Sequence, residues 1–294
     1  MRRSTTSVGT ENSGSGSDLS TRRRLLVAVL LVELALATAL LWRSGSPSPS
    51  LPAAPPQVTS SPAVSVPQEP VTSVVLPDGR TALLLALGGP QSSVLLDRLG
   101  PELGAAAAAV TAFWGPDWPR DIEIAVAGSD EQFRVLAGGA ADIAATTTRQ
   151  RIMFAPGAAG MSPAALRIVL RHELFHYAVR AQTAADAPRW LTEGVADYVG
   201  RPPAPVPGPS RAGELAQLPT DADLDTPGAA RSLAYDRAWW FSRYVADAYG
   251  VGKLRELYLR ACQPGHPDVA TALRETLGAD LDAVVAGWHR WLTG

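Results

Sequence analysis

The sequence has little cysteine, little histidine and no excess of charge of either sign. Its 294 residues include one cysteine, Cys262, so no disulfide can form within the chain. This cysteine lies in a leucine-rich stretch, where we expect a buried, unreactive thiol. The formal net charge is −2, from 26 Lys and Arg against 28 Asp and Glu, so the charge balance indicates no nucleic acid or acidic surface as a partner.

Two of the four histidines lie four positions apart, and a glutamate directly follows the first. His172, Glu173 and His176 form the motif H-E-x-x-H. Side chains at positions i and i+4 of an α-helix share one face, so both imidazoles can reach one metal ion, with Glu173 at its edge. Two neutral imidazoles suit zinc, and a catalytic zinc takes a third protein ligand and leaves one position for water. The motif therefore predicts a zinc-binding helix.

The segment Trp190–Tyr198, which reads WLTEGVADY, supplies the candidate third ligand. Proline fits the first turn of a helix, so Pro188 indicates a second helix that runs back beside the first, which we expect to end near Arg180. Glu193 can then face the two histidines. Asp197 lies one turn further along the same face, where it can accept the free ring N–H of a ligating histidine.

The segments Arg171–Tyr177 and Trp190–Tyr198 resemble the gluzincin pattern of the peptidase-MA-like zinc metallopeptidases. This resemblance implies that the two histidines and Glu193 bind one zinc ion, that Glu173 is the general base, and that the aspartate four residues after Glu193 supports the site. All five positions of the pattern match. The resemblance also implies a sheet edge beside the motif helix that binds the substrate backbone by strand addition, for which we expect Arg149–Ala155.

The chemistry implied by the resemblance is hydrolysis of peptide bonds in a peptide or protein substrate. Zinc on His172, His176 and Glu193 lowers the pKa of a bound water and polarises the scissile carbonyl, while Glu173 moves the water's proton to the leaving amine. Related enzymes often use a Tyr or His from a later helix as a second oxyanion donor. Tyr235 is the candidate here, with a purely structural tyrosine as the alternative.

A second class of function stays open, a non-catalytic zinc-binding interaction domain displayed on a membrane stalk. The two classes differ in their need for a proton acceptor beside the metal. A structural zinc site has no use for a general base, so the presence of Glu173 favours the enzyme.

The N-terminus combines a polar, arginine-ended segment with an apolar run. Residues 1–24 are expected to form a disordered cytoplasmic tail. Residues 25–42 contain one charged residue, Glu33, and as a helix span roughly 27 Å, enough for a bilayer core. Arginines before this run outnumber the single Arg43 after it, so we expect a signal anchor with the C-terminal part outside the cell. A cleaved signal peptide is the alternative, because the run contains an Ala-Leu-Ala sequence.

The remaining chain divides into a linker and a folded domain. Residues 43–70 are rich in Pro and Ser and are expected to form a semi-rigid stalk without a core. Residues 71–294 are expected to form one zincin-like α+β domain. It consists of a small mixed N-terminal sheet with helices, the motif helix, and a mostly helical C-terminal part.

Local patterns place the elements of this domain. Strands are expected at Val74–Leu76, Thr81–Leu85 and Ile122–Ala127, with a strand or hairpin within Ile143–Phe154. Helices are expected at Leu95–Trp114 and Glu131–Ala137, from Ser162 onward, and at Ser232–Tyr249, Gly252–Ala261, Pro267–Leu277 and Leu281–Leu292. A Pro- and Gly-rich loop is expected at Arg201–Ala230, where three alternate aspartates lack the glycine and closing glutamate of an EF-hand.

Overall fold

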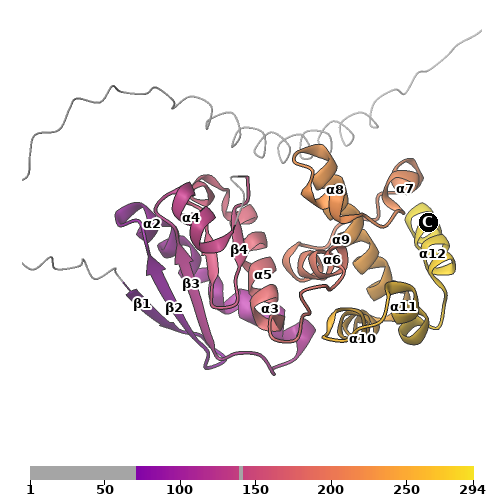
Figure 1. The fold of residues 1–294 in the computed structure, drawn as a ribbon, viewed down its shortest axis with the longest axis horizontal. Helices are drawn as coiled ribbons and strands as arrows, with labels where there is room; N and C mark the ends of the chain where they lie inside the picture. Colours follow the sequence, from indigo (N-terminus) through magenta and orange to yellow (C-terminus); the bar gives the residue numbers. More distant parts are fainter. Residues whose placement is uncertain (1–70, 139–141) are drawn as a thin grey trace, which may run out of the picture. The chain divides into compact units, whose positions relative to one another are not determined.

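The computed structural model describes residues 71–138 and 142–294 (Figure 1). The tail, the membrane anchor and the linker predicted for residues 1–70 lie outside the described residues. Among the helices of the two described ranges, none combines the length and the apolar character that a bilayer crossing needs.

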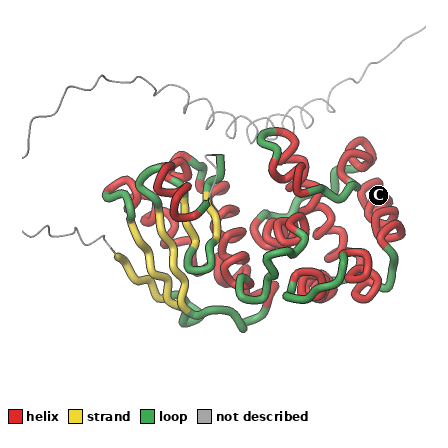
Figure 2. Tube along the Cα trace, in the orientation of Figure 1, coloured by secondary structure: helices red, strands yellow, loops and turns green. Residues whose placement is uncertain are grey.

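A five-stranded mixed sheet forms the N-terminal part, in the order β1-β2-β3-β5-β4 (Figure 2). Strands β1 (Val71–Val75) and β2 (Thr81–Ala86) form the predicted antiparallel hairpin, and β3 (Asp121–Val126) runs parallel to β2. Strand β5 (Ile152–Phe154) is parallel to β3, and β4 (Ala145–Thr147) pairs antiparallel with β5. The sheet therefore ends at β1 on one side and at β4 on the other.

Helices cover both faces of the sheet. Leu84 and Ile124 belong to the main core with α2 (Pro90–Leu99) and α3 (Leu103–Trp114), whereas Phe133 of α4 (Asp130–Ala137) packs with Ala125 and Met153 in a smaller core. Ser129 caps α4, because its side chain accepts a hydrogen bond from the backbone N–H of Gln132.

The single helix expected over Leu95–Trp114 is wrong. The chain there forms α2, a 3₁₀ turn at Gly100–Glu102, and then α3. Pro101 has no backbone N–H to donate and its ring crowds the preceding turn, so one regular helix cannot run through it. A second 3₁₀ turn, Pro156–Gly160, leads from β5 towards the motif helix.

The motif helix α5 (Pro163–Val179) begins where the sequence predicts. The Ser162 side chain accepts a hydrogen bond from the backbone N–H of Ala165, and Pro163 occupies the first turn. Leu170 and Leu174, on the side away from the histidines, are fully buried. The next helix, α6 (Arg189–Gly200), packs against α5 and starts directly after Pro188.

The C-terminal part is helical, as expected, and α6 also packs against its longest helix. The expected loop Arg201–Ala230 is only partly correct, because it contains two short helices. Thr220 and Asp223 form a capping box at the N-terminus of the second short helix, Asp221–Asp225. These polar residues therefore satisfy backbone groups where a helix begins. The elements are α7 (Pro209–Leu215), α8 (Asp221–Asp225), α9 (Ala229–Tyr249), α10 (Val251–Cys262), α11 (Val269–Leu277) and α12 (Leu281–Thr293).

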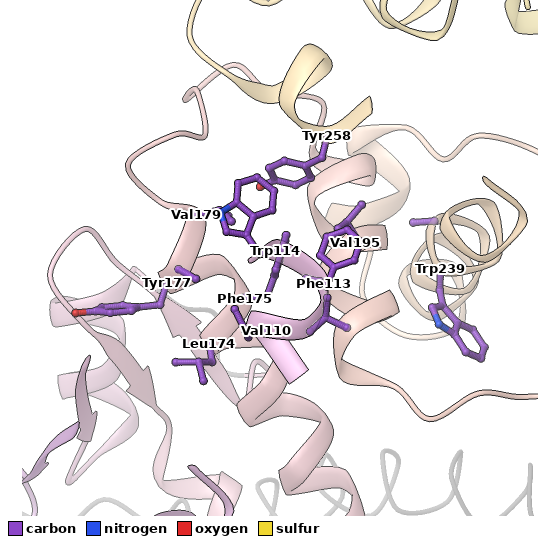
Figure 3. Packing of buried hydrophobic residues seen from close by; sticks show 14 of the residues in the cluster. Val110, Phe113, Trp114, Leu174, Phe175, Tyr177, Val179, Val195, Trp239 and Tyr258 are labelled. Carbon is purple, nitrogen blue, oxygen red and sulfur yellow. The ribbon is translucent and has the colours of Figure 1, made fainter. Parts of the chain in front are cut away.

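An aromatic cluster packs against the motif helix α5 and fixes its position (Figure 3). The ring centroid of Phe175 lies 5.9 Å from that of Trp114 on α3 and 5.4 Å from that of Tyr258 on α10, both in edge-to-face geometry. Cys262, one turn after Tyr258, is buried as expected, and burial raises the pKa of its thiol to about 12. Phe175 directly precedes His176, so this packing sets the rotation of α5 about its axis.

Candidate metal centre

Three side chains from two adjacent helices converge on one point. His172 and His176 lie on α5 and Glu193 lies on α6, and one ligand atom from each is within 4.8 Å of the others. The Nε2 atom of His172 lies 3.1 Å from the Nε2 atom of His176 and 3.1 Å from the Oε2 atom of Glu193. The Nε2 atom of His176 lies 3.6 Å from the same carboxylate oxygen.

These distances fit a tetrahedral zinc ion. Ligand atoms placed about 2.0–2.1 Å from zinc in a tetrahedron are separated from one another by about 3.3 Å. The three measured separations, 3.1, 3.1 and 3.6 Å, bracket that value. The donors are two imidazole nitrogens and one carboxylate oxygen, the set of a catalytic zinc site with a fourth position for water. The side chains keep 12 to 20% of their surface exposed, so solvent can reach the centre.

Asp197 orients the first histidine. Its Oδ1 atom lies 3.0 Å from the Nδ1 atom of His172, and its residue surface is 4% exposed. An ionised carboxylate can only accept, so Nδ1–H of His172 donates to Asp197, and in the neutral imidazole Nε2 then carries the lone pair that can bind a metal ion. The structure places Asp197 where the sequence analysis expected it.

Arg201 holds Asp197 in turn, and the sequence analysis did not identify it. Its Nη2 atom lies 2.6 Å from the Oδ2 atom of Asp197, and its Nη1 atom donates a 2.8 Å hydrogen bond to Asp236 on α9. The guanidinium also lies 5.0 Å from the ring centroid of Trp239. The spacing of Asp197 and Arg201, four residues apart, is a signal from which this ion pair could have been predicted.

The site residues shift one another's pKa values. Burial lowers the pKa of His172, but hydrogen bonds to Asp197 and Glu193 outweigh it and raise that pKa well above 6.5. Burial raises the pKa of Glu193, but the charge of His176 and hydrogen bonds to both histidines bring it well below 4.5. Burial raises the pKa of Asp197, but the charge of Arg201 and the hydrogen bond to His172 together outweigh it and lower that pKa. The centre therefore keeps two anionic carboxylates beside its imidazoles.

Glu173 is buried next to the centre and is held by a residue of the sheet. Its Oε2 atom lies 2.7 Å from the hydroxyl of Thr147, the last residue of β4, and its backbone oxygen lies 2.9 Å from the same hydroxyl. Glu173 is not among the three converging side chains, which agrees with a role other than metal binding. No pattern in the sequence indicates Thr147, because the contact joins residues 26 positions apart.

Tyr235, the candidate oxyanion donor, lies beside the centre on α9. Its ring centroid is 6.4 Å from that of His172. Burial, and then the negative charges of Glu193 and Asp197, raise the pKa of its phenol, so the hydroxyl stays protonated and can donate. The other two histidines, His266 and His289, lie outside this group.

The sheet edge beside the motif helix is a different strand from the one expected. Arg149–Ala155 includes β5, which lies inside the sheet between β3 and β4, so that expectation is wrong and β4 is the edge. Ala155 donates to the backbone oxygen of Ala144, and Thr148 donates to that of Arg151. Because such bonded pairs alternate along an antiparallel ladder, Ala145 and Thr147 direct their backbone N–H and C=O groups to the free edge.

The fold and the centre together define a class, an α+β protein with a His-His-Glu group that can bind one zinc ion. No protein-family model and no curated protein matches the sequence. The solved structures to which the chain is similar include the following two. Against aminopeptidase A of Legionella pneumophila in complex with aspartic acid, identity is 16% over 75% of this chain and 28% of that chain, with a TM-score of 0.46.

The second structure is an M1 zinc metallopeptidase from Deinococcus radiodurans. It is 16% identical over 76% of this chain and 50% of that chain, with a TM-score of 0.45. The chain thus spans half or less of the length of these two proteins. The geometry of the side chains, and not this distant likeness, supports a zinc site.

Proposed function

We propose that this protein is a zinc metallopeptidase that hydrolyses peptide bonds with Glu173 as its general base. The observation that carries the proposal is the convergence of His172, His176 and Glu193, with ligand-atom separations that suit zinc. His172, His176 and Glu193 would hold the zinc ion, which would supply a Lewis acid for the scissile carbonyl and for the attacking water.

Glu173 carries the proton in this proposal. One of its two carboxylate oxygens accepts the hydrogen bond from Thr147, which leaves the other to accept a proton from the attacking water. The water oxygen bonds to the carbonyl carbon, the carbon–nitrogen bond breaks, and Glu173 delivers the proton to the amine nitrogen. Burial of the carboxylate excludes competing solvent from this transfer.

Tyr235 stabilises the developing oxyanion in this proposal. Its phenol lies beside His172 and keeps its proton, because burial and the adjacent carboxylates raise its pKa. A neutral hydroxyl in a partly buried site can donate a hydrogen bond to the carbonyl oxygen as negative charge develops on it.

A peptide substrate binds along the free edge of β4. Thr147, which is partly exposed, presents a backbone donor and acceptor there, and an extended peptide can pair with it as an added strand. Thr147 contacts Glu173, so a peptide on this edge lies next to the proposed base.

We also propose where the protein is located in the cell, from the membrane anchor predicted at residues 25–42. The composition of that segment favours a single membrane span, with the N-terminus in the cytoplasm and the catalytic part outside the cell. This part of the proposal rests on the sequence alone.

The test compares zinc content and peptide cleavage in the full-length chain and its Glu173→Gln variant. We expect one zinc per chain in both, and cleavage of a mixed peptide library that is slower in the variant by about 10²- to 10⁴-fold. Glu131→Gln, at an exposed position on α4, is the control and should cleave normally. If both chains bind zinc and neither cleaves any peptide, the non-catalytic interaction domain is the better account. If neither binds zinc, both accounts are wrong.

A further inference from the structure

One threonine joins the edge strand to the proposed base. The hydroxyl of Thr147 lies 2.7 Å from the Oε2 atom of Glu173 and 2.9 Å from its backbone oxygen. Both Glu173 atoms accept only, so the single hydroxyl proton is shared between them, and the charged carboxylate is the stronger acceptor. The contact ties the end of β4 to the turn of α5 that carries the motif.

The contact restricts a side chain that would otherwise have several rotamers. A glutamate has three rotatable side-chain bonds, and its terminal torsion is broad, so burial alone does not fix the direction of the carboxylate oxygens. A hydrogen bond from Thr147 to Oε2 fixes that direction and turns the second oxygen of Glu173 to the other side. Proton transfer needs this control, because donor and acceptor must be within hydrogen-bond reach.

The backbone of the same residue faces the substrate edge. The ladder between β4 and β5 turns the N–H and C=O groups of Thr147 away from β5, while its side chain points to α5. Thr146 alternates with it, so its side chain lies on the opposite face of the strand. Within residues 71–138 and 142–294, no strand pairs with the outer side of β4. Thr147 therefore contacts Glu173 through its side chain, while its backbone can pair with a peptide.

We propose that Thr147 is a positioning residue that orients the Glu173 carboxylate and keeps it in register with a peptide bound along β4. This proposal rests on the proposed peptidase function. It extends that function by one residue, whose hydroxyl acts through Glu173 and does not touch the substrate or the metal ligands.

Three variants of the full-length chain separate this role from a structural tie between β4 and α5. Thr147→Val keeps the shape and removes the hydroxyl, Thr147→Ser keeps the hydroxyl, and Thr146→Val is the matched control on the opposite face of the strand. With a library peptide that the unmodified protein cleaves, we expect Thr147→Val to lower kcat by about 10- to 100-fold. Its KM should change little, because the backbone that pairs with the peptide is unchanged.

The Thr147→Ser variant and the Thr146→Val control show whether a lower kcat in Thr147→Val comes from the loss of the hydroxyl. Thr147→Ser should restore kcat to within about threefold, and Thr146→Val should match the unmodified protein. Equal kcat in the valine and serine variants at position 147 overturns the proposal. So does a loss of kcat in Thr147→Val that follows a loss of thermal stability and that serine does not repair, because that pattern indicates a structural tie alone.

Crystal structures of the zinc-loaded proteins provide a measurement that does not depend on activity. We expect one position of the Glu173 carboxylate in the unmodified protein and in Thr147→Ser, and a displaced or divided position in Thr147→Val. An unchanged Glu173 carboxylate in Thr147→Val overturns the positioning role, even if no peptide is cleaved by any of the proteins. Absence of cleavage by the unmodified protein contradicts the proposed function and leaves this comparison intact.

Discussion

At the scale of single residues, His172 links the metal centre to its support. Its Nε2 atom faces His176 and Glu193, and its Nδ1 atom faces Asp197. Each of these neighbours makes a different contribution, so single substitutions around His172 should have separable effects on zinc binding.

Glu193→Ala should abolish tight zinc binding. It removes one of three protein ligands and leaves two imidazoles, so we expect affinity to fall by more than about 100-fold, beyond the usual effect of changing a residue that only supports a ligand. Competition with a chromogenic chelator measures this. Glu256→Ala removes an exposed carboxylate on α10 and is the control. Full zinc occupancy in Glu193→Ala would remove Glu193 from the ligand set.

Arg201→Met should weaken both zinc binding and the fold. Asp197 is buried, so loss of the guanidinium leaves its charge compensated only by His172, at a cost of about 3 kcal/mol in the free energy of unfolding. Zinc affinity should fall by about 10-fold, because the imidazole is held less firmly. Urea unfolding and chelator competition measure the two effects. Arg211→Met breaks an exposed pair and should cost less than about 1 kcal/mol; equal costs would contradict a structural role of Arg201.

The site residues differ in how far the sequence predicts them. His172 and His176 follow from the geometry of one helix, and Glu193 and Asp197 follow from a second helix that returns beside it. Thr147 does not, because its contact with Glu173 depends on where an edge strand docks on α5. The contact of Arg201 with Asp236 could not be predicted either. The two residues are 35 positions apart, and only the packing of α9 against α6 brings them together.

At the scale of elements, α6 is held between α5 and α9 by two close backbone approaches. A β-carbon at Gly200 would lie 3.0 Å from the backbone oxygen of Ile168 on α5. A β-carbon at Gly194 would lie 2.4 Å from the backbone oxygen of Ala238 on α9. Glu193 is next to Gly194, so the same packing that seats α6 sets the position of the third ligand.

Gly194→Ala should therefore damage the fold and the metal centre together. The added methyl meets backbone atoms of α9, which cannot rotate away, so we expect a loss of about 1–3 kcal/mol or more in the free energy of unfolding. Zinc affinity should also fall, because α6 moves away from α5. Gly213→Ala in α7 is the control, since a β-carbon there has open space and should be neutral or slightly stabilising. Equal stability of the two variants would contradict the close packing of α6.

Elements with local signals were predicted better than their arrangement. The β1–β2 hairpin, the caps at Ser129 and Ser162 and the last four helices follow turn and cap residues along the chain. The order of β5 and β4 does not, because it depends on which strand pairs with β3, and this decided the sheet edge. Short helices such as α7 also escaped prediction, since a Pro- and Gly-rich segment gives no periodic pattern.

At the scale of the whole molecule, zinc should stabilise the folded chain by joining α5 to α6. Ligand binding to the native state adds about 4 kcal/mol at a free concentration of 1,000 times Kd. We expect a chelator to lower the Tm of the full-length protein and added zinc to restore it. A Tm that does not change with zinc would contradict a metal centre that bridges the two helices.

This stabilisation should depend on pH with a defined sign. Without zinc, the raised pKa of His172 means that its protonated form contributes stability below pH 6.5, which is lost as pH rises through the raised pKa. Zinc needs the neutral imidazole, so protons compete with the metal at lower pH. The gain in Tm from zinc should therefore be larger at about pH 8 than at about pH 6. A gain that is independent of pH would exclude His172 as a ligand.

Anomalous diffraction at the zinc edge, from crystals of the zinc-loaded full-length protein, tests the central claim most directly. We predict a single strong peak between the Nε2 atoms of His172 and His176 and the carboxylate of Glu193. A peak elsewhere, or three side chains directed away from one another with no peak among them, would contradict the metal centre and the peptidase proposed from it.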